Sequence, residues 1–256
     1  MSLRVLVTAG GSGIGLGIAE AFADAGEQVH VCDIDESRVS ALSGSGIGAT
    51  TTDVSDPGQV AALFVEVQSV LGGLDVLVNN AGTAGPTGPI ESLSFEDWRE
   101  TLSVNLDSQF LCAHHAVPML KAAGGGSIVN IASTAGLHGY PLRAPYAAAK
   151  WGVIGLAKTL AMELGPHGIR VNAICPGSVE GERLDRVIAA EALTRGVGKE
   201  RVRTDLLGQT SMRTFVHARD VAELALFLCS DAGARISGQA IAVDGHTEGL
   251  GLRETS

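Results

Sequence analysis

The stretch that decides the fold runs from residue 3 to residue 15 and reads Leu-Arg-Val-Leu-Val-Thr-Ala-Gly-Gly-Ser-Gly-Ile-Gly. Its first part, 3–7, is rich in Val and Leu and predicts a strand buried on both faces. Glycines follow, and then apolar residues recur at helical spacing, at Ile14, Ile18 and Phe22. A strand, a glycine-rich turn and a helix in this order present free backbone N–H groups to a phosphate. A tight turn that binds nothing is the alternative, because Leu16 interrupts the usual Gly-x-Gly-x-x-Gly pattern.

The alternation of strands and helices continues along the chain. Further strands are expected at 28–32, 49–52, 74–78, 127–132, 169–175 and 239–243, and helices follow from about 56, 94, 146 and 220. This order predicts an α/β fold with one doubly wound parallel sheet of about seven strands, helices on both faces and right-handed crossovers. The charged segment 178–216 interrupts the alternation and is long for a connection, so we expect a substrate lid within a single 1–256 domain.

Composition excludes several classes of function. The chain has 256 residues, of which 45% are hydrophobic, and this suits one large domain with a substantial core. Its net charge of −10 argues against a nucleic-acid partner. We find no signal-peptide pattern and no apolar run long enough for a membrane span, so we expect a cytoplasmic protein without membrane contact. The four Cys lie far apart without metal-ligand spacing, which predicts reduced thiols and no metal site.

The candidate chemistry centres on Tyr146 and Lys150, which are four residues apart. On a helix both side chains point from one face, one turn apart. An ammonium beside a phenol favours the phenolate and lowers its pKa from about 10, which suits a general acid or base. Ser133 follows the predicted strand 127–132, at the strand end where open parallel sheets bind ligands. The alternative is an amphipathic helix with a half-buried Tyr and a solvated Lys.

Two further polar residues stand at informative places. Asp33 ends the second strand, twenty residues after Gly13, where a carboxylate accepts hydrogen bonds from an adenosine ribose and repels a 2′-phosphate. No Arg or Lys stands at 34 or 35, so NAD is favoured over NADP; a surface Asp that caps the next helix is the alternative. Asn105 lies within an apolar series, Trp98 to Phe110, on a helix opened by a capping box at Ser94. Taken by itself, this position is better explained by a core Asn satisfied by backbone.

In this order the motifs resemble those of the short-chain dehydrogenase/reductase (SDR) family, in its classical branch, over nearly the whole chain. Residues 8–15 match the family's TGxxxGxG with Ala9 in place of the first glycine, residues 79–82 match NNAG, and Pro176-Gly177 matches the PG after strand six. The family's catalytic tetrad is matched by Asn105, Ser133, Tyr146 and Lys150.

The resemblance implies a Rossmann-like fold, a homotetramer, and hydride transfer between a nicotinamide and an alcohol or carbonyl carbon. It implies that Tyr146 takes the alcohol proton, that Ser133 holds the substrate oxygen, and that Asn105 anchors a water in a proton relay. Lys150 would bind the nicotinamide ribose and lower the pKa of Tyr146. The implied cofactor contacts are Gly10, Ser12, Gly13, Ile14, Asp33, Asp53, Val54, Asn80, Ala81, Gly82, Tyr146, Lys150, Pro176, Gly177 and Val179.

Three positions depart from the family pattern. Ala9 adds constraint to the glycine-rich turn. Gly181 stands where the family's PGxVxT has a threonine that contacts the carboxamide, so a neighbour such as Ser178 would have to supply that contact. His246 replaces the second glycine of the common DGG, and it is either a surface or interface residue or one that reaches a substrate pocket.

We therefore expect an NAD(H)-dependent oxidoreductase that interconverts a secondary alcohol, such as a polyol, a sugar or a hydroxy acid, and its ketone. The alternatives are an NADPH-dependent 3-oxoacyl reductase, a non-catalytic NAD(H) sensor, and a lyase on the same fold. Lyases that resemble the family lose the glycine-rich turn and carry Arg at the place of Lys150, and neither change is present. Arginines of 178–216, Arg183 and Arg186 among them, suggest an anionic substrate, although such side chains are often solvated or ion-paired.

Overall fold

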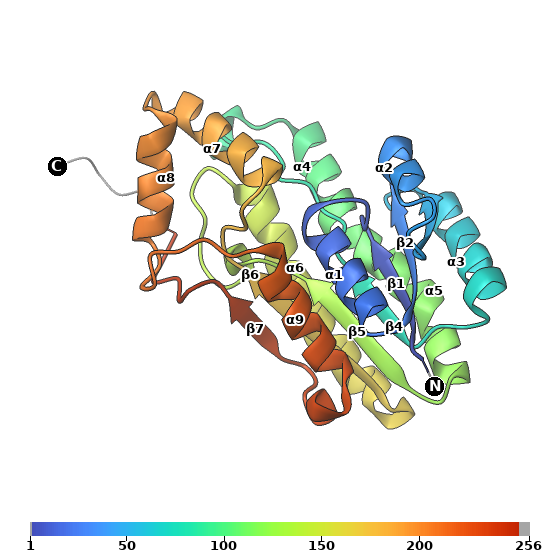
Figure 1. The fold of residues 1–256 in the computed structure, drawn as a ribbon. Coiled ribbons are helices and arrows are strands. Elements are labelled where there is room, and N and C mark those ends of the chain that lie inside the picture. Colours follow the sequence, from blue (N-terminus) through green and yellow to red (C-terminus); the bar gives the residue numbers. More distant parts are fainter. Residues whose placement is uncertain (1, 251–256) are drawn as a thin grey trace.

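The computed structural model describes residues 2–250, and within them seven strands form one parallel sheet (Figure 1). The order across the sheet is β3-β2-β1-β4-β5-β6-β7, and every neighbouring pair is parallel. The strands are β1 Arg4–Thr8, β2 Gln28–Asp33, β3 Gly48–Thr51, β4 Val76–Asn79, β5 Gly126–Ile131, β6 Ile169–Pro176 and β7 Ala240–Val243. This confirms the predicted doubly wound sheet, and each strand begins and ends within two residues of its expected bounds. The ends of the expected 1–256 unit lie outside the described residues.

Helices cover both faces of the sheet, as predicted (Figure 1). They are α1 Gly13–Asp24, α2 Glu36–Ala41, α3 Pro57–Leu71, α4 Phe95–Leu102, α5 Ser108–Ala122, α6 Ala144–Leu164, α7 Glu182–Arg195, α8 Lys199–Gly208 and α9 Ala218–Cys229. Successive residues of β1 serve opposite cores: Val5 and Val7 pack with α1 and α9, and Leu6 packs with α3, α5 and α6. Burial on both faces explains why β1 and β4 read as continuous Val and Leu runs.

The predicted helix from Ser94 to Phe110 is interrupted. The capping box is present, because Ser94 Oγ accepts from the Asp97 N–H and Asp97 Oδ2 accepts from the Ser94 N–H. One π-helical turn, Ser103–Asp107, then separates α4 from α5. The extra residue of a π turn rotates the helical phase. Asn105 is therefore fully buried, whereas Phe110, which we expected on the same apolar face, is 56% exposed.

The segment 178–216, which we expect to be a substrate lid, forms the helices α7 and α8, which lie together in Figure 1. They have a small core of their own, made by Leu184, Ile188, Ala192, Val202, Leu206 and Phe215. The two ends of the segment are joined, because Val179 and Val216 form a parallel bridge and the Val216 N–H donates to the Ser178 carbonyl oxygen at 2.9 Å. The segment thus leaves and rejoins the sheet region at the same place, where Val179 and Val216 lie side by side.

The remaining expectations about composition concern cysteines, membranes and metals. All four Cys are free; Cys32, Cys112 and Cys175 are buried and Cys229 is partly buried. No helix within residues 2–250 has the length and apolar character needed to cross a membrane. The same described range contains no cluster of three or more His, Cys, Asp or Glu side chains suited to a metal ion.

Candidate active site

The glycine-rich turn between β1 and α1 is packed too tightly for side chains at two positions. A Cβ on Gly15 would lie 2.2 Å from the Ala9 carbonyl oxygen and 2.4 Å from the Asn80 side-chain nitrogen. A Cβ on Gly10 would lie 2.5 Å from the Cβ of Val31 on β2. Only glycine fits these places, so the turn is pressed against the carboxyl ends of β1, β2 and β4.

A pair of polar side chains holds this turn to the end of β4. The Asn80 amide donates to the carbonyl oxygens of Thr8 at 2.9 Å and Ala9 at 3.1 Å. The buried Thr8 hydroxyl accepts from the backbone N–H groups of Asn80 at 2.9 Å and Ala81 at 3.0 Å. The NNAG motif therefore maintains the turn, and a contact of Asn80 with the cofactor stays a prediction.

The start of α1 fits an anion such as a dinucleotide pyrophosphate. Gly13 has φ +55°, and a Cβ placed on it would meet nothing within 4 Å. The Ser12 side chain makes no capping hydrogen bond, and the first turn carries no acidic residue. The space beside Gly13 is thus open at the positive end of the helix dipole, which suits a phosphate.

Ala9 adopts a left-handed backbone conformation, with φ +50°. The family pattern has glycine at this position, and glycine reaches this conformation without the steric cost that a Cβ brings. The expected constraint on the turn is therefore a specific one, a left-handed alanine whose carbonyl oxygen receives the Asn80 amide.

Asp33, at the end of β2, is 3% exposed and sits beside the glycine-rich turn. Its Oδ2 accepts from the Gly11 N–H and its Oδ1 accepts from the Asp35 N–H, both at 3.1 Å. The cap of the next helix is Asp35, which accepts from the Ser37 N–H, so the reading of Asp33 as a surface cap is wrong. Arg38 pairs with Asp35 at 3.4 Å.

The other expected cofactor residues lie at the carboxyl ends of the strands. After β3, Asp53 Oδ1 accepts from the Ser55 N–H and hydroxyl at 2.9 and 2.6 Å, and Val54 is buried in the core. After β6, the Gly177 N–H donates to the Val243 carbonyl oxygen at 2.9 Å. A Cβ on Gly177 would lie 2.9 Å from the Cβ of Asp244, which keeps this turn close to the end of β7.

Lys150, on the second turn of α6, is 2% exposed, and its Nζ donates to the Ile131 carbonyl oxygen at 2.9 Å. Its Nζ lies 5.7 Å from the centroid of the Tyr146 ring. A solvated lysine on an amphipathic helix is therefore excluded. The ammonium is held between the carboxyl end of β5 and the phenol. The spacing of the two residues predicted that they lie side by side, but not the contact with β5.

Gly82 brings the turn after β4 against two members of the expected tetrad. A Cβ on Gly82 would lie 2.7 Å from Asn105 Oδ1 and 3.5 Å from Lys150 Nζ. Asn105 donates through Nδ2 to the Thr101 carbonyl oxygen at 2.8 Å, whereas its buried Oδ1 has no hydrogen-bond partner among the described residues. Backbone therefore satisfies only half of this amide, and the other half faces the site.

Ser133 follows β5 and has an extended backbone. Its Oγ accepts from the Ala135 N–H at 3.1 Å and so caps the short turn Thr134–Gly136. A Cβ on Gly136 would lie 2.6 Å from the Lys150 carbonyl oxygen, which shows how closely this turn packs on α6. A hydrogen bond from the Ser133 hydroxyl is among the influences that stabilise the Tyr146 phenolate and lower its pKa.

Three cations surround the Tyr146 ring. The guanidinium carbons of Arg143 and Arg183 lie 5.1 and 5.9 Å from its centroid, and Lys150 is the third. Desolvation raises the pKa of Tyr146, but the charges of Arg183 and Lys150, the Ser133 hydrogen bond and the charge of Arg143 outweigh it, so the pKa is lowered. Desolvation in turn lowers the pKa of Lys150 to about 8, against the opposing effect of Tyr146.

The contacts of the two arginines with the Tyr146 ring were not predicted from the sequence, although Arg183 was considered there as a residue for an anionic substrate. Arg143 stands three residues before Tyr146, at the N-cap of α6, so its closeness in sequence was the one available signal. Arg183 comes from α7, and only the folding of 178–216 over the site brings it to Tyr146.

Gly181 has φ +132°, a conformation that side chains rarely adopt, which accounts for glycine at the place of the family's threonine. His246 is exposed, with Nδ1 2.9 Å from the Ser211 hydroxyl.

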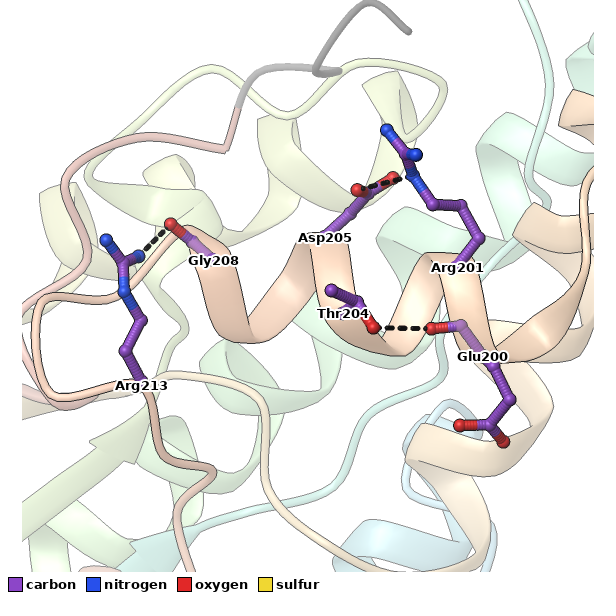
Figure 2. A pocket seen from close by; sticks show the side chains of 6 residues that line it. All are labelled: Glu200, Arg201, Thr204, Asp205, Gly208 and Arg213. Atoms are coloured by element: carbon purple, nitrogen blue, oxygen red, sulfur yellow. Dashed lines mark hydrogen bonds and ion pairs between the residues drawn. The ribbon is translucent and has the colours of Figure 1, made fainter.

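A hollow of about 620 Å³ lies elsewhere, along α8 (Figure 2). It is lined by Glu200, Arg201, Thr204, Asp205, Gly208 and Arg213. Figure 2 shows these side chains engaged with their own neighbours: Arg201 pairs with Asp205 at 3.0 Å, and the Thr204 hydroxyl donates to the Glu200 carbonyl oxygen at 2.8 Å. None of the expected catalytic or cofactor residues lines this hollow.

Known proteins with similar sequences span the same length. A family model described as enoyl-(acyl carrier protein) reductase matches residues 8–246. The chain is 37% identical to D-beta-hydroxybutyrate dehydrogenase of Rhizobium meliloti strain 1021, over 96% of this chain and 98% of that protein. It is 38% identical to trans-4-hydroxycyclohexanecarboxylate dehydrogenase of Sinomonas cyclohexanicum, over 97% and 94%.

Solved structures agree with the fold. A variant of an actinorhodin polyketide ketoreductase, with NADPH, superposes with a TM-score of 0.91 at 33% identity, over 95% of this chain and 96% of that one. An NAD+-bound xylitol dehydrogenase superposes with a TM-score of 0.90 at 27% identity, over 93% and 96%. The chain is an oxidoreductase whose fold binds a nicotinamide cofactor, and it belongs to the classical branch of the short-chain dehydrogenase/reductase family.

Proposed function

We propose that this protein is an NAD(H)-dependent dehydrogenase that interconverts a secondary alcohol and its ketone, with Tyr146 as general acid and base. The observation that carries the proposal is the setting of Tyr146, a phenol whose pKa is lowered by three cations at the carboxyl end of the sheet. A phenol that loses its proton more readily is a better base for an alcohol near neutral pH. The two relatives named above are dehydrogenases of hydroxy acids, which supports a hydroxy acid, with polyols and sugars as further candidates.

The proposed roles of the side chains follow from their positions. A bound nicotinamide would supply the hydride acceptor or donor. Tyr146 would accept the alcohol proton, and Ser133 would hold the substrate oxygen through its hydroxyl. Lys150 would keep the phenolate stable from its fixed place on the Ile131 carbonyl oxygen. Asn105 would hold a water on its unpartnered Oδ1, through which the proton leaves the site.

The cofactor would lie along the glycine-rich turn and the carboxyl ends of the strands. Its pyrophosphate would meet the first turn of α1, where Gly13 leaves open space. We propose that the other residues expected from the family pattern, at the ends of β1 to β4 and β6, contact the rest of it: Gly10, Ser12, Ile14, Asp53, Val54, Asn80, Ala81, Gly82, Pro176, Gly177 and Val179. With glycine at 181, the carboxamide contact would fall to a neighbour such as Ser178.

Asp33 supports NAD over NADP. Its buried carboxylate is held by two backbone N–H groups beside the turn, where it would repel a 2′-phosphate. The nearby Arg38 pairs with Asp35. Comparing kcat/KM for NADH and NADPH tests this, and Asp33→Ala should shift the preference toward NADPH. A strong NADPH preference in the unaltered protein would refute the role of Asp33.

Two other functions remain as candidates. An NADPH-dependent 3-oxoacyl reductase is favoured by the NADPH-bound polyketide ketoreductase of the same fold, and the matching family model also names an acyl-carrier substrate. Turnover of acyl thioesters with NADPH, and none of simple alcohols with NAD, would establish it. A non-catalytic NAD(H) sensor would bind NAD tightly but give no NADH absorbance change with any alcohol or ketone tested.

We also propose a homotetramer in the cytoplasm, with a small-molecule substrate and neither nucleic acid nor membrane as partner. Large apolar side chains are exposed on the helices α5 and α6, namely Phe110 at 56%, Trp151 at 52% and Met162 at 83%. Apolar faces of this kind are typical of subunit interfaces. Light scattering after size-exclusion chromatography measures the assembly directly, and a monomer at micromolar concentration would refute it.

The proposed function is tested with a panel of hydroxy acids, polyols, sugars and ketones, each followed by NADH absorbance. The panel is run on the unaltered protein and on Tyr146→Phe. We expect turnover of at least one class in the former and loss of turnover with retained NADH binding in the latter. Full activity of Tyr146→Phe would remove Tyr146 from the reaction.

A further inference from the structure

Two arginines from different parts of the chain face the same phenol. Arg143 immediately precedes α6, and Arg183 lies in the first turn of α7, within 178–216. Their guanidinium carbons lie 5.1 and 5.9 Å from the centroid of the Tyr146 ring. The place where the proposed reaction would occur therefore carries two guanidinium groups in addition to the Lys150 ammonium.

Arg143 is the more buried of the two, at 4% exposed. Its Nη2 donates to the Ala84 carbonyl oxygen at 2.6 Å, and its guanidinium carbon lies 5.4 Å from the Tyr140 ring centroid. Its buried Nε has no hydrogen-bond partner, and no carboxylate within residues 2–250 forms an ion pair with it. A buried guanidinium without an anion is costly, so an anionic ligand would stabilise this arrangement.

Arg183 differs from four other arginines of its segment, which form ion pairs, whereas Arg213 donates to the Gly208 carbonyl oxygen. Arg186 pairs with Glu182, Arg195 with Glu191 and Asp205, Arg201 with Asp205, and Arg203 with Glu180. Arg183 forms no ion pair among the described residues; its Nη1 donates to the Gly82 carbonyl oxygen at 3.2 Å. The positive charge that α7 presents to Tyr146 is thus available to a ligand.

The Tyr146 phenolate is one anion whose charge these arginines could balance. A phenolate carries one negative charge, however, whereas three cations lie within 6 Å of its ring centroid. Even with Tyr146 ionised, the site keeps a net charge of about +2, and the burial of Arg143 and Lys150 strengthens its attraction for a second anion, which the exposed Arg183 can meet from the solvent side. A carboxylate is the simplest match, because a guanidinium binds its two oxygens in a planar, bidentate geometry.

We propose that Arg143 and Arg183 form a carboxylate-binding subsite beside Tyr146, and that the substrate is a hydroxy acid whose carboxylate lies there. This inference rests on the proposed function. Because Arg183 belongs to 178–216, the carboxylate would also connect α7 to the body of the site, next to the Gly82 contact that is already present. Arg186, which we considered with Arg183 from the sequence, pairs with its own partner Glu182 and takes no part.

The test compares acids with their uncharged esters. Lactate, 3-hydroxybutyrate and 4-hydroxypentanoate place a carboxylate progressively farther from the same secondary alcohol, and the methyl ester of each removes the charge. With NAD, kcat/KM is measured for the unaltered protein, Arg143→Gln and Arg183→Gln. Arg186→Gln is the matched control, since it removes an exposed arginine one turn along the same helix.

We expect at least one acid to be preferred over its ester by tenfold or more, and this preference to fall at least tenfold in Arg143→Gln and Arg183→Gln. Arg186→Gln should keep the preference. Equal losses for acid and ester would mean that the arginines act only on the phenol, and equal use of acid and ester by the unaltered protein would overturn the subsite. Circular dichroism shows whether Arg143→Gln folds. If it does not, the change in the preference for acid over ester in Arg183→Gln alone tests the subsite.

Calorimetry separates this inference from the proposed function. The acids are titrated into the protein with NADH present, so that no oxidation occurs. Binding that depends on Arg183, without turnover of any alcohol, would leave the subsite standing and refute the dehydrogenase. Turnover of alcohols, without Arg183-dependent binding of any acid, would refute the subsite and leave the dehydrogenase standing.

Discussion

Replacing Gly13 by alanine should lower both the stability of the fold and the affinity for the cofactor, and the two losses can be measured separately. Gly13 has φ +55°, so alanine would be strained there by about 1–2 kcal/mol. Part of this strain is offset, because alanine lowers the conformational entropy of the unfolded chain, which stabilises the folded state by about 0.4–1 kcal/mol. The net loss of stability is therefore about 1 kcal/mol, which lowers Tm by roughly 2–4 °C in a domain of this size.

The loss of binding free energy for the cofactor should be larger than this loss of stability. The methyl group enters space that is otherwise open within 4 Å, where the phosphate would approach the first turn of α1. Losing one hydrogen bond to a charged group costs about 1.5–3 kcal/mol, so Kd for NADH should rise at least tenfold. Calorimetric titration with NADH gives Kd, and thermal denaturation without cofactor gives Tm.

Gly15→Ala is the contrasting variant. Its methyl group would lie 2.2 Å from the Ala9 carbonyl oxygen, so the fold itself must shift and Tm should fall further than in Gly13→Ala. An unchanged Kd for NADH in Gly13→Ala, with the expected fall in Tm, would refute the placement of the phosphate at this turn.

Two predictions concern stability. Ala9→Gly should remove the left-handed alanine at φ +50° and raise Tm by up to a few degrees, and a fall in Tm would show that the turn is not strained. Asp75 accepts from Arg4 Nε and Nη2, both at 2.8 Å, and these bonds lower the pKa of Asp75. Its stabilising contribution is present above its unfolded pKa of about 3.9 and is lost as pH falls through the lower folded value. Asp75→Asn should therefore cost about 1–3 kcal/mol in urea unfolding at pH 7 and flatten the pH dependence below about pH 4; an equal cost at pH 7 and in acid would contradict this.

The sheet could be predicted because its signals are local. Most strands contain a short run of Val, Ile or Leu, and most carboxyl ends are followed by a Gly, Asn or Asp turn, so the strand bounds came out within two residues. The weak strand β3, Gly-Ala-Thr-Thr, is the exception in composition. The pairing of Tyr146 and Lys150 was visible for the same reason, since four residues span one helical turn.

The structural features that we did not predict from the sequence depend on contacts between distant residues or on a change of helical period. The π turn at Ser103–Asp107 shifts the phase by one residue, and an ordinary helical pattern cannot show this. In 178–216 the apolar residues Leu184, Ile188 and Ala192 do recur every four residues, but the many charges between them obscured the helix. The approach of Arg183 to Tyr146 needs the folded segment and has no signal in the spacing.

The most direct test of the central claim is a spectroscopic titration of the two tyrosines of the chain. Burial raises the pKa of Tyr140 to about 12, whereas the cations around Tyr146 lower its pKa below the ordinary 10.0. Ultraviolet absorbance of the phenolate, followed in native protein from pH 6 upward, therefore separates them without any substrate. We predict one phenolate forming below pH 10, absent in Tyr146→Phe and displaced to higher pH in Arg183→Gln. Identical titration of the unaltered protein and Tyr146→Phe below pH 10 would contradict the account.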